Sequence, residues 1–479
     1  MQEKGVQGKG VGTVIKISIG SSHVSSQVEN SINQSRDQDQ NPSQKRKQKQ
    51  QKQQQQPPLT AIQIMGPNDE YLVQANTDIT KFWAYENCQA FGCIFDEHNH
   101  ANASDKNNNN NDNDNDNDND KPAKDPNNFL KTINTGYQVL PTKMQGKVYG
   151  HDGSLGGVFD NQGIYGTCEF DIDITPLSGW GDDDDDDDND GDGDGDDDGD
   201  NNDDDHVQQQ HDHHSDIQNN KHQKSTAGWL ASYSIFEPHW QITIADAKAN
   251  GYINWNGTLY ELNNAPLYSE KNWGSSFPTK WYWIQCNSFI GYGNDNDNDN
   301  DNKKRLSLTA GGGKRKVSLL NGLISKEEDL GLVGIHHNGI FYENVPWTGT
   351  MEWDIDIWGK WNFNGKCTTG KRLFEVVVNA TCDDDAGVML RVPTKEYGLE
   401  YMCRDTFEGS VSLSLYELVY CRDVNDYVRR DDVPPIIDNA ISHSCAVEVG
   451  GGPWSSPWKS KSKMNRILKF LVKIPYLIN

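Results

Sequence analysis

The chain has 479 residues, a formal net charge of −27 and 34% hydrophobic residues. Three Asp-rich runs, at 112–120, 182–205 and 295–301, together contain 26 Asp residues, so the rest of the chain is close to neutral. That balance, with scattered basic residues, argues against a nucleic-acid-binding protein. The nine cysteines include no CxxC pair, which argues against a structural zinc site and indicates a reducing compartment.

Low-complexity sequence interrupts the chain at several points. Such segments cannot bury enough apolar surface to offset chain entropy, so we predict that they are disordered insertions. They are the Gln-rich segment 31–57, the Asn/Asp-rich segments 101–124 and 294–302, and the acidic segment 182–224. Between them we expect a shortened first-strand region at 1–30, an N-terminal β-barrel half at 58–181, a C-terminal β-barrel half at 225–454 and a tail at 455–479.

Strand signals begin early in the chain. Residues 12–19 alternate apolar and polar, and a turn cluster at 66–69 separates two strand-like runs, which predicts a hairpin. Past the acidic run, short strand-like segments recur from Trp240–Ala245 to Cys445–Val449, punctuated by Gly, Asn and Pro. The run 294–302 lies between two of them and predicts a hairpin tip. Many short strands without alternating helices favour an all-β fold of antiparallel barrels or sandwiches.

The chain end has a different pattern. Ile467, Leu468, Leu471 and Val472 fall on one side of a helix, with basic residues beside them. Two interpretations stay open: a segment lying on a membrane or lipid-droplet surface, or a short terminal helix packed on the protein. We see no secretory signal, no transit peptide and no apolar run long enough to span a bilayer.

Three motifs suggest ligands and are better explained otherwise. DNDGDG at 188–193 opens like a calcium loop, but Gly199 stands where the bidentate Glu is needed. AGGGKRK at 310–316 lacks phosphate-loop spacing and predicts a glycine-rich turn. His336 and His337 are strand neighbours that point to opposite faces. We therefore predict no metal.

The chemically most suggestive stretch is Phe236–Phe289, which is dense in Trp, Tyr and Phe. Its ionisable groups include Glu237, His239 and Glu270. In an extended chain Glu237 and His239 share a face, as do Tyr268 and Glu270. Apolar burial favours a neutral carboxyl group, which can act as a general acid, and aromatic faces stabilise cations. From the residues alone, an ordinary structural grouping remains the more common explanation.

Longer motifs in order through the chain resemble the tocopherol cyclase family, plastid enzymes of vitamin E synthesis. They are FEPHWQITIA (236–245), SEKNWGSSFPTKWYWIQCNSF (269–289), LSLTAGGG (306–313), VPWTG (345–349), the stretch 391–417, and VEVGGGPW (447–454). The resemblance covers essentially all of the chain outside the insertions. It implies a pair of lipocalin-like β-barrels, a plastid location at plastoglobules or thylakoids, and cofactor-independent closure of the chromanol ring. The substrate implied is a phytyl-benzoquinol, with plastochromanol formation from plastoquinol as a related reaction.

The resemblance also guides the assignment of roles. A more distant similarity to carotenoid hydratases, which carry HxW and YxD pairs, points to His239-Trp240 and Tyr268-Ser269-Glu270. We expect Glu270 to protonate the prenyl double bond, His239 or Glu237 to accept the phenolic proton, and Tyr268 to orient the acid or the quinol. The expected aromatic wall comprises Trp240, Trp273, Trp281 and Trp283. Rival acids are Asp354, Asp356, Glu375 and Asp405.

Two other functions fit the same aromatic site. One is a non-catalytic, lipocalin-like carrier of prenylquinols or carotenoids. The other is hydration of a prenyl double bond, which yields a tertiary alcohol in place of a chromanol.

Overall fold

The computed structural model describes most of the chain outside the low-complexity segments. The described residues are 14–20, 59–76, 78–84, 90–97, 125–150, 166–181, 226, 239–273, 277–292, 305–319, 324–369, 372–394, 398–430, 432–462, 464 and 469–470. The predicted insertions, Glu237 and most of the predicted C-terminal segment lie outside these ranges. None of the helices within them is long and apolar enough to cross a membrane.

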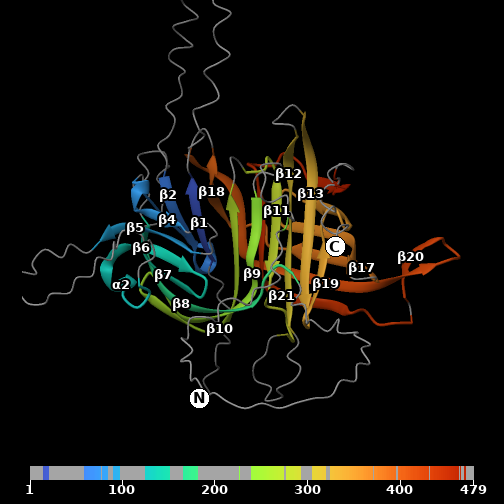
Figure 1. The fold of residues 1–479 in the computed structure, drawn as a ribbon, viewed down its shortest axis with the longest axis horizontal. Coiled ribbons are helices and arrows are strands. Elements are labelled where there is room, and N and C mark those ends of the chain that lie inside the picture. The colour runs from blue at the N-terminus through green and yellow to red at the C-terminus, as the bar shows by residue number, and fades with distance from the viewer. Residues whose placement is uncertain are drawn as a thin grey trace, which may run out of the picture.

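Three antiparallel sheets make up the fold (Figure 1). The first is small, in the order β1-β2-β3. Its strands are β1 (Val14–Gly20), β2 (Leu59–Met65) and β3 (Tyr71–Asn76). A 3-10 turn, Pro67–Asp69, joins β2 to β3, which confirms the predicted hairpin.

The second sheet has seven strands in the order β10-β9-β8-β7-β6-β5-β4. They are β4 (Phe82–Ala84), β5 (Phe91–Glu97), β6 (Ile133–Leu140), β7 (Lys143–Gly150), β8 (Gly166–Ser178), β9 (His239–Trp255) and β10 (Thr258–Trp273). A 3-10 turn (Ile79–Lys81) precedes β4, and the short helix α2 (Phe129–Thr132) precedes β6. The two longest strands, β9 and β10, follow the acidic segment in sequence and form one edge of this sheet.

The third sheet has twelve strands, along the path β14-β13-β12-β11-β21-β19-β17-β16-β15-β22, with β18 and β20 also pairing with β19. They are β11 (Trp281–Cys286), β12 (Leu306–Leu319), β13 (Ile324–His337), β14 (Ile340–Asn344), β15 (Thr350–Ile355), β16 (Lys360–Thr369), β17 (Arg372–Thr381), β18 (Val388–Thr394), β19 (Gly398–Cys421), β20 (Asp426–Arg429), β21 (Ile437–Gly450) and β22 (Trp458–Lys461). Strands β11 and β12, which flank the 294–302 run, are antiparallel neighbours, as a hairpin requires.

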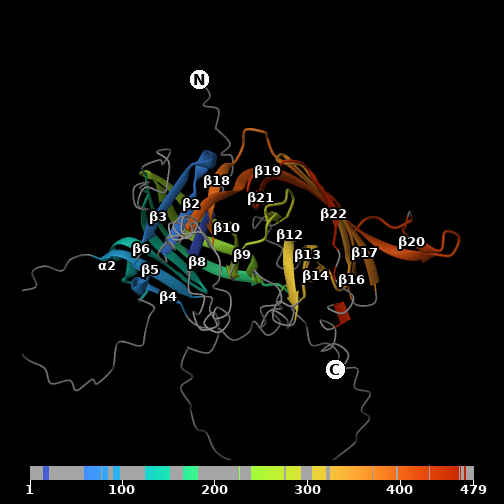
Figure 2. The ribbon, with the colours of Figure 1, turned by 90° about the horizontal axis from the view of Figure 1, so that it is seen from above.

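The all-β, antiparallel prediction is confirmed. The hydrogen-bonded path of each sheet is open at both ends, so the described strands form no closed barrel and pack as layered sheets. Figure 2 shows the sheet of β4–β10 on one side of the molecule, the curled twelve-stranded sheet on the other, and β18 beside β2 between them.

Strand β2 joins the two large sheets because its side chains are buried on both faces. In β2, Ile62 and Ile64 point into a core shared with β7, β8 and β9, whereas Met65 packs with β18 and β19. Gln63 lies on the β18 side, where its side chain donates to the Arg391 carbonyl (2.9 Å) and accepts from the Arg391 amide (3.1 Å). Strand alternation thus lets one strand serve two interfaces.

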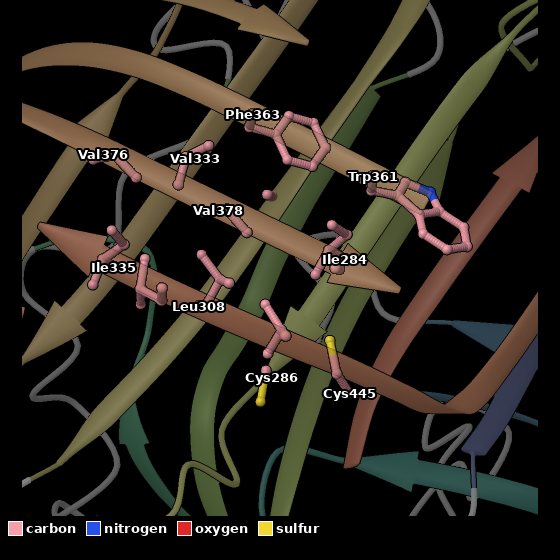
Figure 3. Packing of buried hydrophobic residues seen from close by; sticks show 14 of the residues in the cluster. Ile284, Cys286, Leu308, Val333, Ile335, Trp361, Phe363, Val376, Val378 and Cys445 are labelled. Atoms are coloured by element: carbon pink, nitrogen blue, oxygen red, sulfur yellow. The ribbon is translucent and has the colours of Figure 1, made fainter. Parts of the chain in front are cut away.

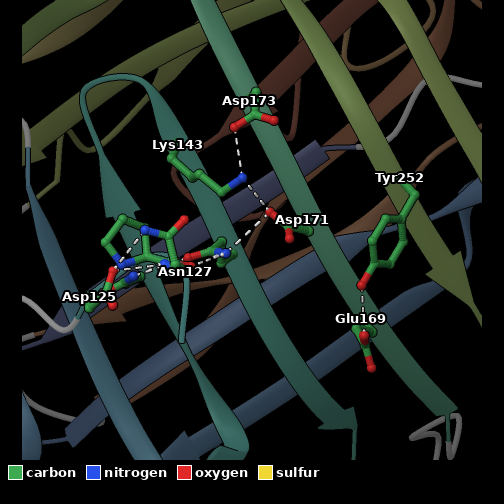
Figure 4. Close-up of polar contacts among 10 residues, drawn as sticks. Asp125, Asn127, Lys143, Glu169, Asp171, Asp173 and Tyr252 are labelled. Carbon is green, nitrogen blue, oxygen red and sulfur yellow. Dashed lines mark hydrogen bonds and ion pairs between the residues drawn. The ribbon is translucent and has the colours of Figure 1, made fainter. Parts of the chain in front are cut away.

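The twelve-stranded sheet curls around its own core. Figure 3 shows Ile284, Leu308 and Ile335 from β11–β13 facing Trp361, Phe363, Val376 and Val378 from β16 and β17. The outer face of the β4–β10 sheet is polar instead: the Lys143 ammonium lies 2.8 Å from Asp171 and 2.7 Å from Asp173 (Figure 4).

Candidate active site

Tyr268 and Glu270 are the two predicted catalytic residues on β10, and they lie where this strand bulges. The register between β9 and β10 shifts at Leu267, Ser269 and Glu270. Bulges redirect side chains and occur often beside functional sites. Here the Tyr268 hydroxyl donates to Glu270 Oε2 (2.7 Å), and Trp240 Nε1 on β9 donates to the same oxygen (2.6 Å). The structure therefore brings together Trp240, Tyr268 and Glu270.

The two oxygens of Glu270 are not equivalent. Oε2 accepts from two neutral donors, the Trp240 indole and the Tyr268 hydroxyl, and Oε1 accepts from the Asn272 side-chain amide (3.1 Å). Because Oε2 is occupied as an acceptor, a proton that Glu270 transfers must be carried on Oε1. The bulge itself is fixed by Thr243, whose hydroxyl contacts the Ser269 hydroxyl and carbonyl, both at 2.9 Å.

Tyr268 is held as a hydrogen-bond donor. Burial raises the pKa of its phenol well above the ordinary value, and the neighbouring Glu270 raises it further, while hydrogen bonds with Trp283 and Thr309 oppose these effects. The Tyr268 ring also lies 5.7 Å from the Trp283 ring, centroid to centroid. Tyr268 therefore links the acid on β10 to the aromatic face of β11.

His239 is not brought to this cluster. In the β9–β10 ladder His239 lies opposite Trp273, and Trp240 lies opposite Asn272. Since consecutive residues of a strand point to opposite faces, the buried His239 side chain faces away from Trp240. Nothing is described of the Trp273 side chain, and Glu237 lies outside the described residues.

Trp281 and Trp283 share one face of β11, and beside them lies an acid that the sequence argument did not single out. The Trp281 indole donates to Glu448 Oε1 on β21, and Glu448 is the register partner of Trp283. In the neighbouring β19–β21 ladder, Glu448 is the register partner of Asp405, which has no exposed surface. Glu448 falls within the VEVGGGPW motif, and this motif was the sequence signal that could have drawn attention to it.

The other rival acids are paired with a basic residue or exposed. Glu375 forms an ion pair with Arg429 (2.6 Å), and Asp354 lies 3.5 Å from Lys459. Asp356 is exposed. Asp405 is thus the buried member of that group.

A pocket opens on the ring of Trp240. Its lining includes Trp240, Gly311, Arg315, Leu330, Leu332 and Trp347. A Cβ on Gly311 would lie 2.5 Å from the Trp240 ring, so only glycine lets the indole approach β12 this closely. The prediction of a glycine-rich turn at 310–316 is therefore wrong: these residues continue strand β12, and its glycines accommodate aromatic rings.

These features define an all-β protein in which aromatic side chains and buried carboxyl groups gather between two antiparallel sheets. Comparisons with known proteins agree on a narrower class. The model of a family described as tocopherol cyclase-like matches residues 15–451, and the chain belongs to that family.

Two plant relatives show the extent of the likeness. The chain is 33% identical over 413 residues to the "Tocopherol cyclase, chloroplastic" of Zea mays, covering 86% of this chain and 69% of the maize protein. It is 34% identical over 412 residues to the "Probable tocopherol cyclase, chloroplastic" of Oryza sativa subsp. japonica, with the same two coverages. No solved structure matches the chain.

Proposed function

We propose that this protein is a tocopherol cyclase, which closes the chromanol ring of tocopherols from a phytyl-benzoquinol. Family membership supports the proposal, as do the names of the two plant relatives. The observation that carries it is the Glu270 carboxyl group, held by the Trp240 indole and the Tyr268 hydroxyl beside further aromatic rings. Plastoquinol would be a second substrate of the same kind.

The proposed first step is proton transfer from Glu270 Oε1 to the prenyl double bond, which leaves a tertiary carbocation. Trp240 and Trp283 would stabilise this cation, by roughly 0.5–2 kcal/mol for each cation–π contact. Exclusion of water would prevent capture of the cation as an alcohol.

In the second step the quinol hydroxyl oxygen forms the new C–O bond and releases its proton. Ionised Glu270 is then an available base, because His239 faces away from the cluster; Glu237 is the other candidate. One proton is added and one is released, so the overall change is an isomerisation, of the intramolecular lyase type, that consumes no reductant or oxidant.

Replacing Glu270 with Gln tests the proposal. Purified protein is incubated with a phytyl-benzoquinol without added cofactor, and the chromanol is quantified by chromatography. We expect E270Q to lose at least about 100-fold in rate, the usual range for removal of a general acid. Glu261→Gln, at an exposed position of the same strand, is the matched control.

The outcomes separate the alternatives. Full activity of E270Q would exclude Glu270 as the acid, and E448Q and D405N would then be compared. Binding of the quinol by wild-type protein without any product would favour a carrier, and a tertiary alcohol would favour a hydratase.

We also infer a plastid location, since both relatives are named chloroplastic. Association with plastoglobules or thylakoids, and contact with a lipid surface, form part of the same proposal because the substrate is a membrane-soluble lipid. Fractionation of plastids with an antibody to this protein would test both.

A further inference from the structure

Asn287, which directly follows β11, connects the two large sheets at the bulge beside the proposed site. Its side-chain amide donates to the Leu267 carbonyl on β10 (3.0 Å) and to Asp246 Oδ1 on β9 (3.3 Å). Both of these partners are acceptors, so the nitrogen of the amide, and not its oxygen, must face them. One side chain from the edge of β11 therefore holds both strands of the bulge.

The two contacts of Asn287 fall on the residues that adjoin Tyr268. Between its pairings with Ala247 and Ile244, β10 has a single residue, Tyr268, whereas β9 has two, of which one is Asp246. Such a mismatch interrupts the regular ladder that fixes the backbone of a strand. The Asn287 amide therefore supplies hydrogen bonds at the point where the Tyr268 side chain leaves the backbone.

Arg305, the residue before β12, holds Asp246 in place. Arg305 Nη2 lies 2.5 Å from Asp246 Oδ2, while Oδ1 accepts from Asn287, so both oxygens of the carboxylate are used. The Asp246 side chain is only 14% exposed, and hydrogen bonds to a charged group are stronger where water is largely excluded. The ion pair therefore fixes the orientation of the Asn287 amide, and it does so from the same sheet.

We propose that Asn287 is a positioning residue for the proposed cyclase reaction and that it acts through Tyr268. By holding the Leu267 carbonyl, Asn287 sets the backbone from which the Tyr268 hydroxyl donates to Glu270 Oε2 (2.7 Å). Without the amide, the backbone at the bulge would relax and the phenol would hold the carboxyl group less firmly. The inference rests on the proposed role of Glu270, and it adds a residue of the second sheet to the groups that orient this acid.

The test compares Asn287→Leu, which keeps the size of the side chain and removes its donors, in wild-type and Y268F backgrounds. We expect N287L to lower kcat for chromanol formation by about 5- to 10-fold, the usual effect of one lost neutral hydrogen bond, and to change KM by less than about twofold. In the Y268F background the same substitution should change kcat by less than about twofold, because the hydroxyl group that it positions is gone. Ser288→Ala, at the next and exposed position, should stay within about twofold of wild type.

A measurement without substrate follows Tyr268 directly. The protein is labelled with 3-fluorotyrosine, and the fluorine resonance of Tyr268 is identified by its loss in Y268F. N287L should shift this resonance, and S288A should leave it unchanged. Asn287→Gln, which keeps the donors on a longer side chain, should restore part of the wild-type shift and of kcat. Circular dichroism and urea unfolding confirm that each variant is folded, and Asn287→Ala replaces N287L if the latter does not fold.

Three results would overturn the assignment: the same loss of kcat from N287L in both backgrounds, a Tyr268 resonance that N287L does not move, or equal effects of N287L and S288A. A rise in KM with unchanged kcat would assign Asn287 to substrate binding and would overturn the positioning role as well. If wild-type protein makes no chromanol but N287L still shifts the Tyr268 resonance, the cyclase proposal fails while the structural coupling of Asn287 to Tyr268 stands.

Discussion

Strands β11, β12 and β13 present two faces that have different roles. The face turned towards β16 and β17 carries Ile284, Leu308 and Ile335, closely packed in the core of the curled sheet (Figure 3). The face turned towards β9 carries Trp283 and Gly311, against which Tyr268 and Trp240 pack. We call these the core face and the site face.

The difference between the faces comes from what covers them. The core face is covered by strands of its own sheet, which match it with aliphatic and aromatic side chains. The site face is covered by the β4–β10 sheet, whose aromatic rings pack against glycines of the site face. This packing leaves the pocket beside Trp240. Alternation along one strand therefore places stability on one face and the proposed chemistry on the other.

Removal of a large side chain from the core side should give the largest loss of stability. Trp361 has no exposed surface, and its indole donates to the Glu448 carbonyl (3.2 Å). We expect Trp361→Ala to lower the free energy of unfolding by about 3–5 kcal/mol, through the cavity it creates. Urea denaturation measures the loss, and Lys360→Ala, exposed in the same strand, should stay within about 0.5 kcal/mol of wild type.

If W361A were as stable as wild type, the contrast between a stabilising core face and a catalytic site face would fail. It would be sharpened if the folded fraction of W361A retained its rate of chromanol formation per molecule.

On the site face, His336 should make stability depend on pH. Burial, with a smaller contribution from Arg305, lowers its pKa to about 4, although a hydrogen bond with the Gly181 carbonyl opposes the shift. The ring also stacks on Phe341, with centroids 4.4 Å apart. Because the folded-state pKa lies below the unfolded value of about 6.5, the contribution of neutral His336 is complete above pH ~6.5 and is lost as the pH falls towards 4.

Urea unfolding of wild-type protein and His336→Asn at about pH 7 and pH 4.5 measures this effect. The stability difference between the two proteins should shrink by up to about 3 kcal/mol at the lower pH. A constant difference for H336N would mean that the histidine is already free to ionise in the folded state.

Much of the fold could be predicted because strand alternation and turn residues are local properties. The 66–69 hairpin and the β11–β12 pair follow from them. The glycines at 311–313 show the limit. Their composition is typical of a turn, but the rings that occupy the space above them come from β9 and from β11, about 70 and 30 residues away in the sequence.

The site shows the same division. Tyr268 and Glu270 are two residues apart, and their shared face was predictable. The separation of His239 from Glu270 depends on how β9 pairs with β10, which no spacing within one strand reveals. Glu448 was missed because an acid in an alternating strand is typical of a solvent-exposed face; only the packing of Trp281 against β21 shows that it is buried.

The smallest expected effect comes from removing one hydroxyl group from each face. Tyr268→Phe deletes a donor to Glu270 on the site face, so we expect a loss of about 1 kcal/mol in unfolding free energy and roughly tenfold in kcat. Tyr282→Phe deletes a buried core-face hydroxyl with no hydrogen-bond partner among the described residues, and should be neutral or slightly stabilising. Steady-state kinetics and urea unfolding of both variants check this contrast. If Y268F kept full kcat while Y282F lost it, the proposed chemistry would belong to the core face and the assignment of roles to the two faces would be reversed.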